Sequence, residues 1–408
     1  MFRHLSSVFR KFFPQGNVGK MNAIVFFNSL QFFGAVLVPM LTDWGGLTYA
    51  QAMLLQSIFV LSNTLLEIPT GVVADKWGRK ASIVLGVIFG MVGLTIYGFN
   101  KEFYSFAIGE IALALGMSLM SGADTAMIYD SLKEKGEESK AGSAFGMFGV
   151  VHMFGLMLAT PMGSGIAQYL NLIAPMRFTA IPMVLSLAVA LTLKEPALPA
   201  HVQQPVPRLS KFFAGVSILR SNDRLRSLAL DLTIVAVAGR AMIWLYQPLL
   251  QYVGLPIFVF GFVSATFICV ELLVMSNVDR LDRVMRGREN VFTLGRIVTM
   301  FGFAIGVCAL TAVLAVGQGP LAIVLGLLSP ILGVGFSLSR KPFFDDSMNE
   351  HISSDVRATV LSTVKMMSSA VLIFLNPLIG WSADRSLIIP FVFLTLILLV
   401  WSVYKQFR

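Results

Sequence analysis

Residues 71–80 of this chain read GVVADKWGRK, and this stretch decides the fold. It lies between two apolar runs, Ala52 to Val73 and Ala81 to Phe99. Each run has the roughly 20 apolar residues that a helix needs to cross a bilayer. Gly71 and Gly78 permit close helix approach and a tight turn, and the Asp, Arg and Lys between and after them can form a charge cluster. We therefore expect a short charged turn between two membrane-crossing helices.

The composition of the whole chain agrees with a membrane protein. Of its 408 residues, 56% are hydrophobic and 13% are charged, and the mean hydropathy is +0.77. A soluble domain carries about 25% charged residues, because polar groups must cover its surface. These values exclude a water-soluble enzyme. They also exclude a disordered or nucleic-acid-binding chain, although the net charge is +9.

Apolar runs of this length recur along the chain and predict twelve membrane spans. In the first half the predicted spans are Met21–Leu41, Ala52–Val73, Ala81–Phe99, Phe103–Ile128, Gly142–Leu170 and Ile173–Leu193. In the second half they are Leu225–Val253, Ile257–Val278, Val291–Val316, Leu321–Ser339, Val360–Trp381 and Leu387–Tyr404.

The positions of the basic residues predict the orientation. If both termini are cytoplasmic, most of the 31 Lys and Arg fall on the cytoplasmic side, and the opposite side keeps only Lys101, Arg177 and Arg385. This asymmetry is the positive-inside pattern. It explains the isoelectric point of about 9.6 without a nucleic-acid partner. We expect a multi-pass protein of the cell (inner) membrane.

The two halves of the chain are predicted repeats. Pro39-Met40-Leu41 aligns with Pro248-Leu249-Leu250, and Glu67 with Glu271, while the second copy of the charged loop has lost its glycines. Internal repeats of this kind fix an architecture. We expect an all-α membrane protein with twelve transmembrane helices in two pseudo-symmetric six-helix bundles. The predicted divisions are a basic amphipathic segment at 1–20, bundles at 21–193 and 225–408, and a cytoplasmic linker with an amphipathic helix at 194–224.

Residues 71–80 fit the pattern G-x-x-x-D-x-x-G-R-[KR] between spans 2 and 3, and the chain resembles the major facilitator superfamily over nearly its whole length. The resemblance implies that the loop clamps the two halves on the cytoplasmic side and opens during transport. Asp124, at the end of span 4, is a candidate partner of Arg79. The basic residues of this loop can also be explained as positive-inside charges that set the topology. The topological role and the gating role are compatible. The implied gating residues are Gly71, Asp75, Gly78, Arg79, Lys80 and Asp124.

Ionisable and polar residues inside spans are costly and are therefore candidates for function. The candidates for coupling to protons, because burial favours their protonated form, are Glu67, Glu110 and Glu271. The candidates for lining a substrate cavity are Asn28, Gln31, His152, Arg240 and Lys365. For any one of them the alternative is a structural contact between helices.

Span 5 carries a degenerate form of the glycine-proline motif of superfamily antiporters, at Gly155, Thr160-Pro161 and Gly163. Close helix packing is the alternative reason for these residues. We expect a secondary transporter that exports a small organic molecule in exchange for protons. Uptake by proton symport is the alternative, and a receptor or intramembrane enzyme without transport is a third.

The sequence gives no reason to expect an enzyme, a metal or a cofactor. Cys269 and Cys308 lie in separate apolar runs, and the four histidines show no metal-ligand spacing. The expected partners are a small-molecule substrate, protons and the lipid bilayer, with the protein as a monomer.

The charge asymmetry makes a testable prediction about topology. With Cys269 and Cys308 replaced by serine, a cysteine placed at Gln203 should resist a membrane-impermeant thiol reagent added to intact cells. A cysteine placed at Lys101 should react. Ready labelling at position 203 with protection at position 101 would reverse the predicted orientation.

Overall fold

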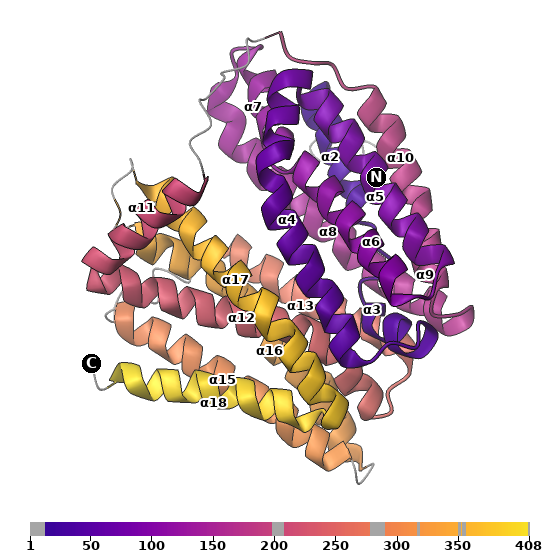
Figure 1. The fold of residues 1–408 in the computed structure, drawn as a ribbon, viewed down its shortest axis with the longest axis vertical. Helices are drawn as coiled ribbons and strands as arrows, with labels where there is room; N and C mark the ends of the chain where they lie inside the picture. The colour runs from indigo at the N-terminus through magenta and orange to yellow at the C-terminus, as the bar shows by residue number, and fades with distance from the viewer. Residues whose placement is uncertain are drawn as a thin grey trace, which may run out of the picture. The chain divides into compact units, whose positions relative to one another are not determined.

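A computed structural model describes residues 13–197, 208–277, 290–315, 319–349, 352 and 356–406. All regular elements in these ranges are helical (Figure 1). Most of the predicted segment 1–20 lies outside them, as do residues 198–207 of the predicted linker. The helices of the first half are α2 (Asn17–Ser29), α3 (Leu37–Pro39), the π-helix η1 (Met40–Trp44), α4 (Tyr49–Trp77), α5 (Arg79–Phe99), α6 (Phe103–Met120), α7 (Ala123–Lys133), the short η2 (Glu138–Lys140), α8 (Ala141–Tyr169), α9 (Ala174–Phe178) and α10 (Ala180–Leu191).

The second half continues with seven described helices. They are α11 (Arg208–Ser221), α12 (Asp223–Tyr252), α13 (Ile257–Ser276), α15 (Asn290–Ala315), α16 (Pro320–Asn349), α17 (Arg357–Arg385) and α18 (Ile388–Gln406). Each of the twelve predicted spans overlaps one or more of the helices. Within the described residues, eight helical segments are long and apolar enough to cross a membrane. The all-α membrane fold is therefore confirmed, and the number of twelve spans stays a prediction.

The first span differs from its prediction. A continuous helix was expected over Met21–Leu41, but α2 ends at Ser29 and α3 begins at Leu37. In the interruption the Phe32 backbone N–H donates to Thr179 Oγ1 at 3.2 Å, outside any helical ladder. Pro39 adds to the break because it has no N–H to donate to the preceding turn. Hydropathy measures apolar content and does not detect where a helix is interrupted.

The described chain divides into two compact units, and the boundary does not follow the middle of the sequence. Unit 1 comprises Met1–Met40 and Ile58–Gln204, and unit 2 comprises Leu41–Ser57 and Pro205–Arg408. Helix α4 therefore contributes to both units. The predicted bundle boundaries at 21–193 and 225–408 stay a prediction.

Helices α5 and α6 form the closest pair in unit 1, and glycines make this possible (Figure 1). A Cβ added to Gly116 of α6 would lie 2.6 Å from the Gly86 carbonyl oxygen and 2.8 Å from the Gly90 nitrogen. A Cβ on Gly93 would lie 2.8 Å from the Gly109 carbonyl oxygen. Such small residues let backbones touch where lipid gives little hydrophobic driving force for association.

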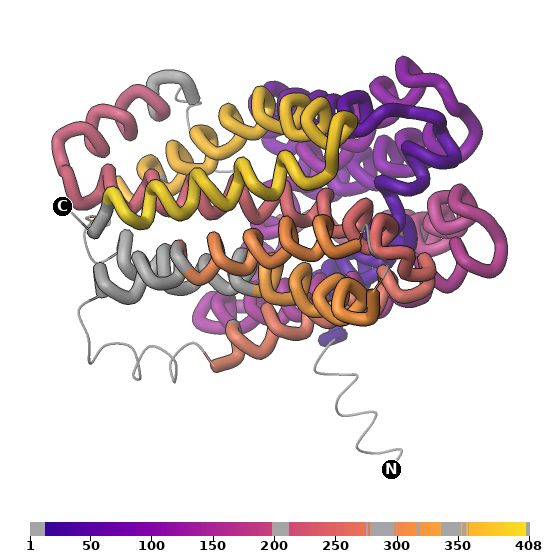
Figure 2. Tube along the Cα trace, turned by 90° about the horizontal axis from the view of Figure 1, so that it is seen from below, coloured from indigo at the N-terminus to yellow at the C-terminus, as the bar shows by residue number. Residues whose placement is uncertain are grey.

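In unit 2, α12 packs against α16 and α17, and α15 packs against α16 and α18 (Figures 1 and 2). The start of α4 is attached to the end of α17. Both Asp384 carboxylate oxygens accept hydrogen bonds there, from Tyr49 N at 2.7 Å and Ala50 N at 3.0 Å. Nearby along the chain, Gln251 Nε2 donates to Asp43 Oδ2 at 2.6 Å. These contacts explain why residues 41–57 belong to unit 2.

The α5–α6 contact predicts a stability difference between two glycine variants. Gly116→Val should lower the apparent melting temperature of the purified protein, because overpacking costs about 1–3 kcal/mol. Gly149→Val is the matched control, since a Cβ there meets no atom within 4 Å. Fluorescence-detected unfolding in detergent measures both. Equal melting temperatures for the two variants would show that the backbones of α5 and α6 do not touch at Gly116.

Candidate functional site

The charged loop between α4 and α5 is a one-residue turn at Gly78. Helix α4 ends at Trp77 and α5 begins at Arg79. Gly78 has φ 94°, a conformation that residues with a Cβ rarely adopt. A Cβ at this position would also lie 2.8 Å from the carboxyl carbon of Glu195. The tight turn expected at Gly78 is thus present. The close approach expected at Gly71 is not, because a Cβ there meets nothing within 4 Å among the described residues.

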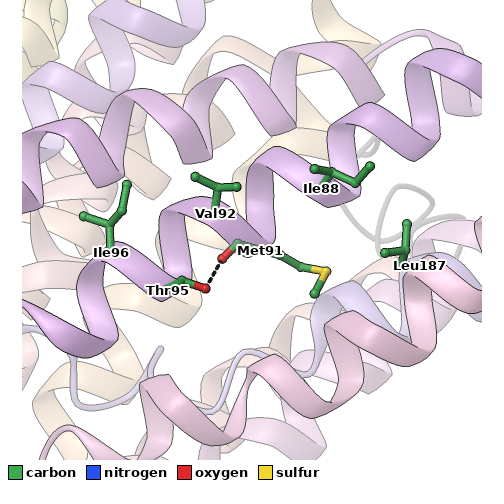
Figure 3. A pocket seen from close by; sticks show the side chains of 6 residues that line it. All are labelled: Ile88, Met91, Val92, Thr95, Ile96 and Leu187. Atoms are coloured by element: carbon green, nitrogen blue, oxygen red, sulfur yellow. Dashed lines mark hydrogen bonds between the residues drawn. The ribbon is translucent and has the colours of Figure 1, made fainter.

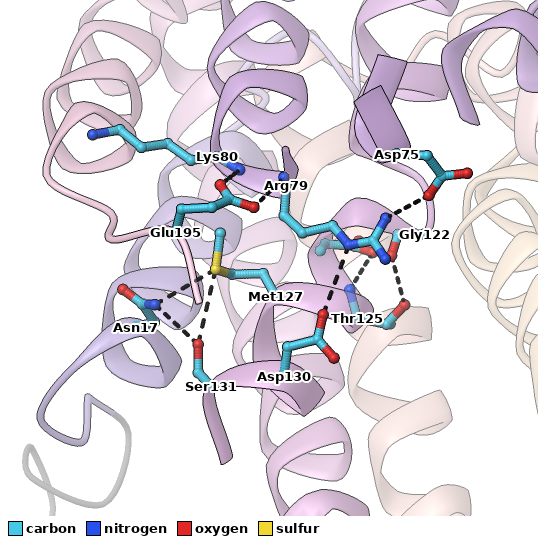
Figure 4. A network of polar contacts seen from close by, with 11 residues as sticks. Asn17, Asp75, Arg79, Lys80, Gly122, Thr125, Met127, Asp130, Ser131 and Glu195 are labelled. Atoms are coloured by element: carbon cyan, nitrogen blue, oxygen red, sulfur yellow. Dashed lines mark hydrogen bonds and ion pairs between the residues drawn. The ribbon is translucent and has the colours of Figure 1, made fainter. Parts of the chain in front are cut away.

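Glu195 caps the first turn of α5 and was not among the predicted site residues. Its Oε1 accepts from the Arg79 backbone N at 2.7 Å, and its Oε2 accepts from the Lys80 backbone N at 2.8 Å. The first N–H groups of a helix have no partner inside the helix, and the helix dipole favours a negative charge beside them. Glu195 therefore ties the segment after α10 to the charged loop (Figure 4).

Arg79 is the centre of the ion pairs at this loop. Its Nη1 lies 3.0 Å from Asp75 Oδ1 of α4, and its Nε lies 3.8 Å from Asp130 Oδ2 of α7 (Figure 4). Asp124, the partner suggested by the sequence, does not pair with Arg79, because its Oδ1 accepts the Thr125 backbone N–H at 2.6 Å at the start of α7. Arg79 thus joins three helices. We call Asp75, Arg79, Asp130 and Glu195 the signature network.

A second set of polar contacts, beside the signature network, fastens α2 to the same region. Asn17 Nδ2 donates to Ser131 Oγ at 2.9 Å (Figure 4). It also donates to the Lys194 carbonyl oxygen at 2.7 Å. Lys194 N donates back to Asn17 Oδ1 at 3.1 Å. Apolar side chains close to this set, including Met21 and Met127, are fully buried. The loop end of unit 1 is therefore a packed assembly of α2, α4, α5, α7 and the segment after α10.

Two of the residues proposed for a substrate cavity, Asn28 and Gln31, lie at the end of α2, and the residue between them in the chain contacts a third, His152; the Asn28 amide itself donates to Met120 Sδ of α6 at 3.3 Å. Gln31 Nε2 donates to the Asn28 carbonyl oxygen at 3.2 Å. Between them, the buried Ser29 hydroxyl lies 2.7 Å from His152 Nδ1 of α8. The Oδ1 of Asn28 is buried without a hydrogen-bond partner among the described residues. Irregular backbone at membrane depth is tolerated only inside protein or along a water-filled cavity.

The remaining charged candidates lie on other helices. Glu110 is buried between α5 and α6, where its carboxylate accepts a hydrogen bond from Tyr97 Oη. This contact corresponds to the structural alternative that the sequence left open. Glu67 is half-buried on α4 in unit 1. Three further candidates are in unit 2, where the structure places Arg240 on α12, Glu271 on α13 and Lys365 on α17.

The glycines of the degenerate glycine-proline motif pack α8 against the first span. A Cβ on Gly155 would lie 2.7 Å from Ser29 Cβ. A Cβ on Gly163 would lie 1.7 Å from the Phe32 carbonyl oxygen, so only glycine fits beside the interruption of α2. These contacts are the close helix packing that was expected as the alternative to an antiporter motif.

A hollow of about 380 Å³ on α5 has none of the chemistry of a solute site (Figure 3). It is lined by Ile88, Met91, Val92, Thr95 and Ile96 of α5 and by Leu187 of α10. The one hydroxyl among them, on Thr95, donates to the Met91 carbonyl oxygen at 2.8 Å. The lining therefore offers a ligand only apolar contacts.

A sequence model of the Major Facilitator Superfamily matches residues 21–376. The chain belongs to this superfamily. A sequence comparison with curated proteins finds no match. Membership and the long apolar helices make the chain an integral membrane protein with the transporter fold of the superfamily.

Solved structures of superfamily type resemble the chain over nearly its full length. The nucleoside transporter NupG has a TM-score of 0.76 at 15% identity, covering 96% of this chain and 98% of its own. A POT family transporter in complex with 5-aminolevulinic acid has a TM-score of 0.71 at 14% identity, covering 95% and 94%. A bacterial homologue of the human lysosomal transporter Spinster, inward-facing and unoccupied, has a TM-score of 0.70 at 16% identity, covering 95% and 96%. At these identities the likeness establishes the fold alone.

The cap on α5 predicts a local change in backbone protection. Glu195→Ala should speed amide hydrogen exchange in residues 79–82 several-fold, because losing a helix cap costs about 0.5–2 kcal/mol. Glu138→Ala is the control, since Glu138 is an exposed glutamate of the same unit whose side chain forms no hydrogen bond among the described residues. Exchange measured by mass spectrometry in detergent reports both. Equal protection of this turn in the two variants would contradict the cap.

Proposed function

We propose that this protein is a secondary active transporter that moves a small organic solute by alternating access and exports it in exchange for protons. Membership of the superfamily supports transport in general. The observation that carries the proposal is the signature network, in which one arginine joins three helices at a one-residue turn. A turn that only separated two spans would not need this set of partners.

The signature network has the exposure that a reversible clamp requires. The Arg79 side chain is 19% exposed and that of Asp75 is 40% exposed. Ion pairs at such partly exposed positions contribute about 0–1 kcal/mol, so they can break during a transport cycle. The Glu195 cap uses backbone N–H groups and can persist when the ion pairs open. We assign gating to Asp75 and Arg79, supported by Gly78 and Lys80, with Gly71 and Asp124 as the remaining candidates.

For proton coupling we favour Glu67. It lies eight residues before Asp75 on α4, about 12 Å deeper along the helix axis. A carboxylate in an apolar region is costly when ionised, so protonation eases its passage through an occluded state. Glu110 already accepts a hydrogen bond from Tyr97, which favours a structural role. Glu271 holds the position of Glu67 in the second repeat.

Asn28, Gln31 and His152 are the proposed solute contacts in unit 1, because the first two lie at the end of α2 and His152 contacts Ser29 between them. Arg240 and Lys365 are the proposed contacts in unit 2. Two of the similar structures are a nucleoside transporter and a POT family transporter in complex with 5-aminolevulinic acid. A polar organic solute of this size is therefore the class we propose. Uptake by proton symport is the second candidate, since the same carboxylates serve either direction.

The proposal also includes the setting of the protein. The predicted location is the cell (inner) membrane, with both termini cytoplasmic, and the predicted state is a monomer. The positive-inside asymmetry supports the orientation. A receptor or an intramembrane enzyme would show no net flux, so a flux assay separates these classes from a transporter.

The coupling hypothesis predicts the behaviour of Glu67→Gln in proteoliposomes. A thermal-shift screen of nucleosides and dipeptides selects a solute, and its flux is then followed with and without a pH gradient. The wild type should concentrate the solute only with the gradient. Glu67→Gln should lose gradient-driven accumulation and keep solute exchange, because the glutamine cannot carry a proton.

Glu102→Gln is the control for this assay, because Glu102 is an exposed glutamate in the turn before α6. It should transport as the wild type does. If Glu67→Gln concentrates solute with the wild-type dependence on the pH gradient, Glu67 is not the coupling group. The absence of flux in the wild type for every solute that shifts its stability would instead contradict transport.

A further inference from the structure

The hydrogen bonds of Ser29 fix which nitrogen of His152 carries the proton. Ser29 Oγ lies 2.6 Å from the Val25 carbonyl oxygen and 2.7 Å from His152 Nδ1. A serine hydroxyl has one hydrogen to donate. The Val25 carbonyl can only accept, so the serine hydrogen must lie on that bond. If His152 Nδ1 had no hydrogen, its lone pair would face a lone pair of Ser29 Oγ at a distance of 2.7 Å.

It follows that His152 Nδ1 carries a hydrogen and donates it to Ser29. In a neutral imidazole the other nitrogen, Nε2, is then an acceptor with a free lone pair. Such a tautomer is inferred from the hydrogen-bond network rather than seen directly, and here the network permits only one assignment. The described residues provide no hydrogen-bond partner for Nε2.

His152 is accessible, and no other charged side chain of its helix would compensate a positive charge on the ring. His152 is exposed, 11 residues into the 29-residue helix α8, which contains no other charged side chain. An ionisable residue at this depth faces the protein interior or a water-filled cavity, because lipid would not solvate it. At the end of α2, Asn28 Oδ1 is also buried without a hydrogen-bond partner among the described residues, while its Nδ2 donates to Met120 Sδ of α6 at 3.3 Å.

Charged groups on the elements packed against α8 are engaged elsewhere or remote along their helices. Lys20 Nζ of α2 donates to the Thr192 carbonyl oxygen, and Arg177 Nε of α9 donates to the Gly98 carbonyl oxygen. The others, on α7 and η2, are Asp124, Asp130, Lys133, Glu138 and Lys140. Among the described residues none of these groups forms an ion pair or a hydrogen bond with His152, and Ser29 is the side chain that bonds to its ring.

We propose that His152 Nε2 is an acceptor site at which a proton and an N–H or O–H group of the solute compete, with Ser29 as the residue that positions the ring. The inference rests on the proposed transport function and adds a proton site beside the carboxylates. Uptake of a proton at Nε2 gives an imidazolium with two N–H groups, which no longer accepts a bond from the solute. Loss of that proton restores the acceptor. The lone pair of Nε2 can therefore hold either the proton or the solute group, but not both.

The first test uses protons alone as the probe. Replacing His4, His201 and His351 with glutamine leaves His152 as the only histidine, and ¹⁵N-histidine labelling makes its nitrogens visible to solid-state NMR in lipid nanodiscs. At pH 8 Nδ1 should be the protonated nitrogen, and at pH 5 both should be protonated. Ser29→Ala should populate the Nε2–H form, and Ser29→Thr should keep the wild-type form. An Nε2–H tautomer in the wild type, or an imidazole still neutral at pH 5, overturns the proposal.

The second test measures coupling in the proteoliposome assay with the solute that showed flux. His152→Gln places an amide oxygen near the Nε2 position and cannot be protonated. Whatever its absolute flux, its solute affinity should stay constant between pH 5 and 8, whereas the wild-type affinity should fall about tenfold per unit of pH decrease once the imidazole is mostly charged. Identical pH dependence in the two proteins overturns the coupling role, even if the NMR confirms the tautomer. If the wild type transports none of the solutes, the proposed transport function fails, and the NMR experiment by itself tests whether His152 binds the proton at Nε2.

Discussion

Hydrocarbon offers no hydrogen-bond partner, and the described part of this molecule is organised by that constraint. Every long apolar segment becomes a helix, because only a helix satisfies its own backbone within one segment. Hydroxyl side chains inside the helices follow the same rule by bonding back to the preceding turn, as Thr64 does to the Val60 carbonyl oxygen and Ser368 to that of Val364. Buried acids find a donor on a neighbouring helix. Glu110 receives one from Tyr97, and Asp231 receives one from Trp401 Nε1 at 2.6 Å.

This constraint also explains which parts of the structure could be predicted from the sequence. The helices and the turn at Gly78 follow from apolar runs and from glycine, which are local properties. The predicted site residues were chosen for their charge or polarity at membrane depth, and the structure brings His152 to Ser29, which lies between Asn28 and Gln31 in the chain. It separates Glu110 from them, because a buried carboxylate goes to the nearest donor. Polarity alone does not distinguish a ligand contact from a satisfied helix contact.

The features that could not be predicted are those whose partners are distant in the chain. Glu195 is 116 residues from the N–H group of Arg79 that it accepts, and Asp384 is 335 residues from that of Tyr49. Both carboxylates cap a helix, α5 in one case and α4 in the other. A helix start in a membrane protein has unpaired N–H groups near the apolar phase, so an acid there is strongly favoured. The need for a cap is visible in the sequence, but the residue that supplies it is not.

The interruption of α2 connects the packing of unit 1 with its proposed chemistry. An unwound segment can exist at this depth only if a neighbouring helix approaches closely, and Gly155 and Gly163 of α8 allow that approach. The same approach brings His152 against Ser29 and fixes the ring. The glycines that resemble an antiporter motif are thus required by the geometry of this contact, whichever direction the solute moves. The case for proton exchange therefore depends on the groups that can be protonated, Glu67 and His152. Gly155 and Gly163 contribute to it by allowing the approach of α8 that places His152.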